Sequence, residues 1–297
     1  MPLPSSAPIT LSAIQSETGT GSLRSASTAA GKDPLPTSML DFLGYSAFTP
    51  SLAAYTTVGT TNLTVPAGCT QIEMIIAAGG GSGGGIDTGI GANINVHAGG
   101  GGGAGGVIEQ TVNVTAGQSI TIVVGAGGTS GSATNNPDLW QNGSSSSVTI
   151  GGTTWTAAGG GRGYYAVKSG NTGPGGMAGT GGSPGGNEFF FYGSGGGGGQ
   201  GSEGGQARAD EIPAGSGVYY GAGGDGGDAG AFQCPTPNYV ITLGGGGAGG
   251  GSYQMGISKT TNYAGGGDGC FGETPASFGG RATGQPGTQG GVVFYYK

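Results

Sequence analysis

Charged residues are scarce in this sequence, and positively charged ones are the scarcest. Charged side chains make up 8% of the 297 residues, and 15 acidic residues outnumber eight lysines and arginines, so the formal net charge is −7. Nucleic-acid binding depends on Lys and Arg that neutralise phosphates, and the composition therefore predicts no nucleic-acid partner. Apolar runs also fall short of the ~20 residues that a membrane helix needs. We expect no membrane insertion.

The residue types that carry most catalysis and metal binding are few. His97 is the single histidine, and its neighbours in sequence offer no partner for a Ser-His-Asp or Cys-His arrangement. The cysteines Cys69, Cys234 and Cys270 are widely spaced and form no Cys-x-x-Cys pair, so we interpret them as buried small hydrophobic residues. A bridge between Cys234 and Cys270 stays open. We predict no metal site and no cofactor.

Two pairs of carboxylates could be nominated for glycan hydrolysis, Asp210 with Glu211 and Asp268 with Glu273. A hydrolytic pair has to flank one bond within a pocket, with its carboxyl groups roughly 5–9 Å apart. Proximity in the sequence is the one argument for either pair. We therefore predict that the protein is not an enzyme.

Glycine, in contrast, is abundant. Of the 78 glycines, 49 lie between residues 159 and 291, often in uninterrupted runs. Such a stretch either stays disordered, because glycine loses the most conformational entropy on folding, or packs as polyproline-II-like helices that hydrogen-bond to their neighbours. The runs alternate with islands too apolar for a solvated tether. We predict the packed bundle, over residues 159–286.

Aromatic residues dominate those islands, and we expect the islands to be loops at the ends of the bundle. Tyr and Trp offer rigid contact area at low entropic cost, so binding loops favour them. The alternative is that they cap the bundle or cover sheet edges. The predicted receptor-binding residues are Tyr164, Tyr165, Phe189, Phe190, Phe191, Tyr192, Tyr219, Tyr220, Tyr239, Tyr253, Tyr263 and Phe271.

Short strands precede the glycine-rich stretch, and one strand follows it. In 71–76 the residues Ile72, Met74 and Ile76 alternate on one face, and a Gly151-Gly152 turn predicts a hairpin. The chain ends on an apolar strand at 292–296, which would return to the same sheet. We therefore predict an all-β fold: a β-sandwich of residues 49–158 plus 287–297, with the glycine-rich bundle inserted between strands.

Residues 1–48 have ordinary composition and form a separate segment. Its apolar residues Leu11, Ile14, Met39 and Phe42 are candidates for contacts in assembly. The order Ile9-x-Leu11-Ser12-x-Ile14-x-x-Glu17-x-Gly19, then Ser38-Met39-x-Asp41-Phe42-x-Gly44, resembles the N-terminal segment of many tail proteins of tailed bacteriophages. The resemblance implies that this segment attaches the protein to other phage tail proteins.

The rest of the chain carries a second resemblance. Val65-Pro66-Ala67-Gly68-Cys69-Thr70, then Ile75-Ile76-Ala77-Ala78-Gly79-Gly80-Gly81, and Gly290-Gly291-Val292-Val293 near the end are similar to the glycine-rich domain of phage tail fibre and tail-tip proteins. In related tail adhesins polyglycine helices stack in a sandwich, and the loops between them contact the host surface. The resemblance implies a homotrimeric virion protein that binds a host receptor.

Two competing functions stay open. A purely structural tail or baseplate component would bury the aromatic islands against other virion proteins. A depolymerase of surface polysaccharide would need a carboxylate pair in a groove, and the scarcity of charge makes it the weaker alternative.

Overall fold

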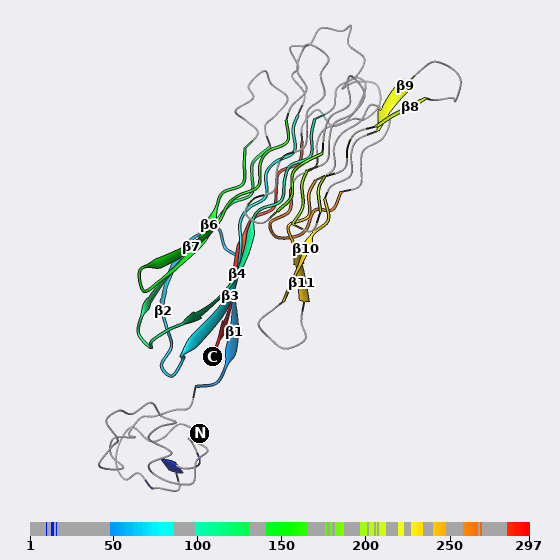
Figure 1. Cartoon of the computed structure of the whole chain (residues 1–297). Helices are drawn as coiled ribbons and strands as arrows, with labels where there is room; N and C mark the ends of the chain where they lie inside the picture. Colours follow the sequence, from blue (N-terminus) through cyan, green and yellow to red (C-terminus); the bar gives the residue numbers. More distant parts are fainter. Residues whose placement is uncertain are drawn as a thin grey trace.

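The computed structural model describes most of the chain from residue 48 onward and four residues before it. The described residues are 10, 13–14, 16, 48–85, 99–130, 141–164, 176, 179, 182–186, 197–200, 202–204, 206, 208–211, 219–222, 227–233, 240–247, 258–266, 268 and 284–297. In strands β8–β11 the backbone alone is described, apart from Gly230 and Leu243. Figure 1 shows two sheets at one end and glycine-rich segments running beyond them.

Two four-stranded sheets form a sandwich. The first sheet has the strand order β1–β12–β3–β4 and the second has the order β2–β5–β6–β7. All neighbouring strands are antiparallel. The expected all-β class and the expected sandwich are thereby confirmed. The strands are β1 (Ser51–Tyr55), β2 (Gly59–Thr64), β3 (Gln71–Ala77), β4 (Val107–Asn113), β5 (Ser119–Val124), β6 (Ser146–Ile150), β7 (Thr153–Ala157) and β12 (Gly291–Tyr296).

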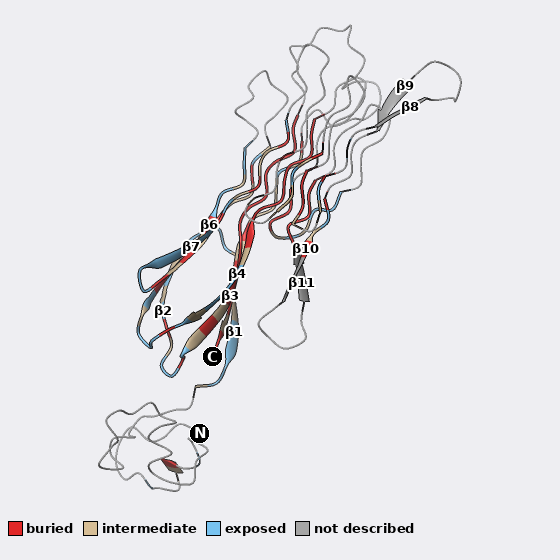
Figure 2. Ribbon diagram, in the orientation of Figure 1, coloured by how far each residue is buried: buried red, intermediate tan, exposed pale blue. Residues whose placement is uncertain are grey.

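The core lies between the sheets and follows the two-residue alternation of the strands. Ile72, Met74 and Ile76 of β3 are buried together, as predicted. Phe294 of β12 is fully buried in the same cluster. Figure 2 shows that buried positions continue from the strands into the glycine-rich segments. The alternating residues that β5 adds to the cluster are Ile120, Ile122 and Val124.

The C-terminal strand occupies the middle of its sheet. In β12, Phe294 is opposite Met74 of β3 on one side and Ala53 of β1 on the other. The end of the chain therefore returns to the sheet, as predicted, and joins β1 to the rest. The predicted β6–β7 hairpin is also present, and its turn residues Gly151 and Gly152 have φ of 56° and 87°. Two consecutive positive φ angles are typical of the type I′ turn, which glycine favours.

The glycine-rich segments continue directly from the sandwich strands and are joined to one another by backbone hydrogen bonds. We call them the glycine layer. Its described parts are 78–85, 99–106, 125–130, 141–145, 158–164, 176, 179, 182–186, 197–200, 202–204, 227–230, 244–247, 258–266 and 284–290.

Hydrogen-bond partners in the central segment change with a period of three residues. Residues 78, 81 and 84 donate their N–H to segment 99–106, residues 79 and 82 to segment 141–145, and residues 80 and 83 to segment 284–290. The central segment is thus bonded to a different neighbour at each successive residue. Its bonds run from Ala78 to Gly106, Gly79 to Ser144, Gly80 to Thr288, Gly81 to Gly103, Ser82 to Gln141, Gly83 to Gln285 and Gly84 to Gly100.

Close approach of the backbones leaves no room for side chains at the centre of the layer. A Cβ added at Gly79 would lie 2.0 Å from the carbonyl oxygen of Ala126, and one at Gly80 would lie 2.1 Å from that of Gly265. At Gly81 the distance to the carbonyl oxygen of Gly161 would be 2.1 Å. Three successive glycines are therefore required by packing alone.

The glycine layer is wider than the predicted stretch of 159–286. It also contains the described residues between β3 and β4 and between β5 and β6, and segment 78–85 lies at its centre. The physical reason is that each glycine segment must find hydrogen-bond partners on its neighbours. Three insertions into the sandwich supply those partners together.

Two hairpins within the glycine-rich stretch were not expected as strands. They are β8 (Arg208–Glu211) with β9 (Tyr219–Ala222), and β10 (Gly230–Gln233) with β11 (Val240–Leu243). Leu243 of β11 packs with Ile75 and Val107 in a second hydrophobic cluster. This cluster joins the glycine layer to the outer face of the first sheet.

Little of the N-terminal segment is described. The N–H of Ala13 donates to Thr10 Oγ1 at 3.1 Å and the N–H of Ile14 donates to the carbonyl oxygen of Thr10 at 3.1 Å, as at the start of a helix capped by Thr10. Ile14 is fully buried. The other three predicted assembly residues, Leu11, Met39 and Phe42, lie outside the described residues.

Candidate functional site

The hydrogen-bond register identifies the end of the glycine layer that is farthest from the sandwich. Segment 158–164 leaves β7, and its carbonyls accept N–H groups from segment 99–106, which enters β4. Ala158 accepts from Gly106 beside the strands, and Tyr164 accepts from Gly100 at 2.8 Å, six residues farther out. Tyr164 thus lies at the far end.

Described segments of two insertions lie side by side at that end. They are 78–85 and 99–106 between β3 and β4, and 158–164 after β7. Gly84 donates to Gly100 and Gly176 donates to Gly101, so Gly176 also lies at this end. The far end therefore contains residues of two insertions that are distant in the sequence.

Tyr164 is the predicted site residue that the structure places on the surface. The residue is 55% exposed, which makes it one of three large hydrophobic residues exposed in the described part of the chain. Its backbone is held by the bond from Gly100. A ring on a fixed backbone can contact a partner at little entropic cost.

Tyr263 has a different position. It is partly buried against the second hydrophobic cluster, and its carbonyl oxygen accepts a hydrogen bond from Thr261 Oγ1 at 2.7 Å. The adjacent Ala264 bonds to Gly105, next to β4. Tyr263 therefore packs where the layer meets the sandwich, and the structure does not bring it together with Tyr164.

Tyr219 and Tyr220 lie in β9, in a hairpin where a loop was expected. The remaining predicted site residues, together with the sequence candidates His97, Cys234, Cys270 and Glu273, lie outside the described residues. These site residues are Tyr165, Phe189, Phe190, Phe191, Tyr192, Tyr239, Tyr253 and Phe271.

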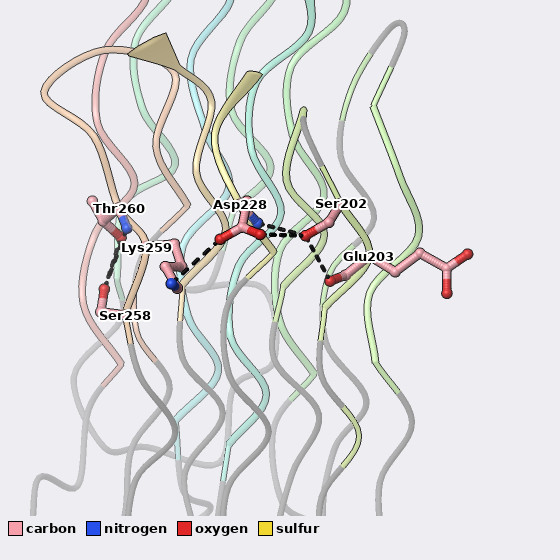
Figure 3. A network of polar contacts seen from close by, with 6 residues as sticks. All are labelled: Ser202, Glu203, Asp228, Ser258, Lys259 and Thr260. Carbon is pink, nitrogen blue, oxygen red and sulfur yellow. Dashed lines mark hydrogen bonds and ion pairs between the residues drawn. The ribbon is translucent and has the colours of Figure 1, made fainter. Parts of the chain in front are cut away.

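A polar network that the sequence did not reveal crosses three segments of the layer (Figure 3). The N–H of Asp228 donates to Ser202 Oγ at 2.8 Å, and Lys259 Nζ lies 3.3 Å from Asp228 Oδ1. The side chains of Lys259 and Asp228 are 42% and 63% exposed. An ion pair this exposed contributes little to stability. The scarcity of charge in the stretch was the signal that could have drawn attention to Asp228 and Lys259.

Of the nominated carboxylate pairs, Asp210 and Glu211 are consecutive in β8, so the two residues take opposite faces of the hairpin. Within the described ranges no three His, Cys, Asp or Glu residues gather as metal ligands. The same part of the chain contains no helix that is long and apolar enough to span a membrane.

Together the fold and the layer define an all-β protein in which a two-sheet sandwich carries tightly packed glycine-rich backbone. The chain belongs to the family described as glycine-rich domain, whose model matches residues 56–297. The match begins directly after β1 and includes both the other sandwich strands and the glycine layer. No curated protein matches the chain.

Proposed function

We propose that this protein is a tail fibre or tail-tip protein of a tailed bacteriophage and binds the host cell surface. In this proposal the glycine layer displays the binding loops and the sandwich forms the body. Residues 1–48 attach the protein to other phage tail proteins in the virion. The receptor is an outer-membrane protein or a surface glycan, and the assembly is a homotrimer.

The finer structure that we propose for the glycine layer is a bundle of polyproline-II-like polyglycine helices. Such a helix has three residues per turn and no internal hydrogen bonds. Its N–H groups would therefore point to a new neighbour at each residue and return to the first after three. The partners of residues 78–84, which repeat in this way, support the assignment.

One observation carries the functional proposal: a tightly packed layer of backbone holds an exposed aromatic residue, Tyr164, at the end farthest from the sandwich. Glycines such as Gly80 have no space for a Cβ, so these positions of the layer cannot carry a side chain. In our proposal the residues that connect the segments of the layer are the ones that vary between related proteins. This division suits a protein that keeps one scaffold and recognises a partner through its loops. Exposed Tyr164 at that end supports the same interpretation.

Binding of the purified protein to intact candidate host cells tests the proposal. One variant replaces Phe189, Phe190, Phe191 and Tyr192 by Ser, and a second carries Tyr164→Ser. We expect both variants to bind fewer cells, with unchanged circular dichroism. Leu52→Ser is the matched control, because Leu52 is 50% exposed but lies on β1 of the sandwich.

A purely structural tail or baseplate component is the competing proposal, because the same packed layer could serve as a rigid spacer. It predicts that the unmodified protein binds no cells that the phage infects. It also predicts that exchanging the aromatic islands leaves the host range unchanged. With either result, the structural component would replace host binding as our proposal.

A further inference from the structure

The main-chain hydrogen bonds of β12 alternate between its two neighbouring strands. Gln71 and Lys297 exchange both of their bonds, at 3.1 Å and 2.8 Å. In steps of two from Lys297, the residues of β12 that bond to β3 therefore include Tyr295 and Val293. Phe294, between them, bonds to β1 on the other side.

The same alternation shows which residues of β1 face the open edge of the first sheet. Ala53 is opposite Phe294 and exchanges hydrogen bonds with it. Leu52 and Ala54, on either side of Ala53, therefore direct their N–H and C=O groups away from β12. Both residues are exposed, and in the part of the chain that the structure describes these groups make no main-chain hydrogen bond.

The sequence of β1 does nothing to block this edge. Natural sheets protect their open edges with charged side chains, proline, bulges or inward-pointing polar residues. β1 contains only Ser, Leu, Ala and Tyr, and it pairs with β12 in continuous register. Val58, in the connection that leaves β1, is also exposed, at 45%. An edge of this kind is suited to the addition of another strand.

β4, the outermost strand at the other end of the same sheet, is protected. Its exposed residues include Glu109 and Gln110. Thr111 is opposite Glu73, whose main-chain bonds go to β12, so Thr111 faces the open edge of β4. The carbonyl oxygen of Thr111 accepts a hydrogen bond from Gln110 Nε2 at 3.0 Å. The contrast distinguishes β1 as the edge that is ready to pair.

We propose that β1 pairs with β1 of a second copy of this chain, antiparallel and about a two-fold axis at Ala53. Leu52 then lies opposite Ala54 of the partner subunit, and the two exchange the main-chain hydrogen bonds that one copy leaves open. The edge is complementary to itself, because its bonding residues lie one on each side of Ala53. It carries no charge, so two copies meet without repulsion.

This contact goes beyond the proposed function and does not depend on host binding. It is isologous, because the same strand is used by both copies. A two-fold contact doubles the unit to which it is added, whether that unit is a single chain or the proposed homotrimer.

Sedimentation equilibrium of the full chain and of Ala54→Pro tests the pairing. Proline lacks the N–H that pairing needs. The N–H of Ala54 faces the open edge, so the bonds between β1 and β12 are kept. We expect the mass of the assembly to fall by half, and Ala54→Lys, which puts a charge on the same edge, should also halve it. Thr111→Pro is the matched control on β4 and should leave the mass unchanged.

Circular dichroism checks that each variant keeps the sandwich. Leu52→Ser keeps every main-chain group of β1, so we expect it to retain the mass of the unmodified protein. Equal masses for the unmodified protein and for folded Ala54→Pro and Ala54→Lys would overturn the proposal. A mass halved equally by Thr111→Pro would also overturn it, since the contact would then involve β4.

Cell binding by the same proteins separates this inference from the proposed function. If the unmodified protein binds host cells and the Ala54 variants keep its mass, host binding stands and the pairing of β1 fails. If the Ala54 variants halve the mass and the unmodified protein binds no host cell, the pairing stands and host binding fails.

Discussion

The hydroxyl groups of Tyr55 and Tyr296 lie 3.2 Å apart and share a hydrogen bond across 241 residues of sequence. Tyr55 is in β1 and Tyr296 is in β12, so the bond ties the first strand of the sandwich to the last. The ring of Phe294 contacts both tyrosines edge to face. Burial and the bond to Tyr55 raise the pKa of Tyr296 above its ordinary value.

The raised pKa of Tyr296 predicts a loss of stability at high pH. The folded protein holds the phenol proton more tightly than the unfolded chain does, whose pKa is near 10.0. This contribution is complete below pH 10 and is lost as the pH rises further. Urea unfolding between pH 7 and pH 11 should show a steeper decline for the unmodified protein than for Tyr296→Phe. If the free energy of unfolding declined equally with pH in both proteins, the prediction would be contradicted.

Gly80→Ala should destabilise the glycine layer severely. Its Cβ would lie 2.1 Å from the carbonyl oxygen of Gly265, and two backbones would have to move apart. We expect a loss of about 3 kcal/mol or more in the free energy of unfolding. Gly291→Ala is the control, since its nearest atom would be 3.6 Å away, and it should change stability by less than about 1 kcal/mol. If Gly80→Ala and Gly291→Ala had similar midpoints of urea unfolding, the packing argument would be refuted.

Ala264→Gly should be nearly neutral, although Ala264 is fully buried. Its φ of 58° is left-handed, which costs an alanine about 1–2 kcal/mol. Relief of that strain offsets the lost methyl contact and the greater entropy of glycine in the unfolded chain. Ala104→Gly, at another fully buried alanine, should cost about 1–2 kcal/mol. Thermal unfolding of both variants measures the difference, and an equal cost would exclude strain at Ala264.

Ser202→Ala should cost more stability than Lys259→Ala. Ser202 Oγ accepts the backbone N–H of Asp228, and its removal takes away that acceptor, at a cost of about 1 kcal/mol. Lys259 contributes an exposed ion pair with Asp228, for which we expect about 0.5 kcal/mol or less. The free energy of unfolding of both variants, measured at low and at high salt, checks this ranking. The loss in Lys259→Ala should shrink at high salt, because salt screens the ion pair, and the loss in Ser202→Ala should not change.

The sandwich strands were predictable because their signal is local. Ile72, Met74 and Ile76 recur at every second position of an apolar run, and Gly151-Gly152 can adopt the positive φ angles of a tight turn. The central place of β12 was not predictable, since pairing of Phe294 with Met74 and Ala53 joins distant parts of the sequence.

In the glycine-rich stretch, the sequence alone does not show which glycine runs are loops and which are packed segments of the layer. A run such as 79–85 looks the same whether it is a loop between strands or the centre of a layer. Its position depends on partners such as Gly103, Ser144 and Thr288, which the local sequence does not specify. For the site, the exposure of Tyr164 was predictable from its island, whereas the partial burial of Tyr263 depends on Ile75, 188 residues earlier.

A layer joined through its main chain also has an unusual thermodynamic character. Unfolding exposes peptide groups there far more than apolar side chains, because positions such as Gly79, Gly80 and Gly81 have none. Apolar exposure raises the heat capacity of unfolding and polar exposure lowers it. The heat-capacity change per residue should therefore fall below the ~12–15 cal/mol/K of ordinary domains. Stability would then vary only gently with temperature, so the protein would remain folded over a broad range of cold and warm conditions.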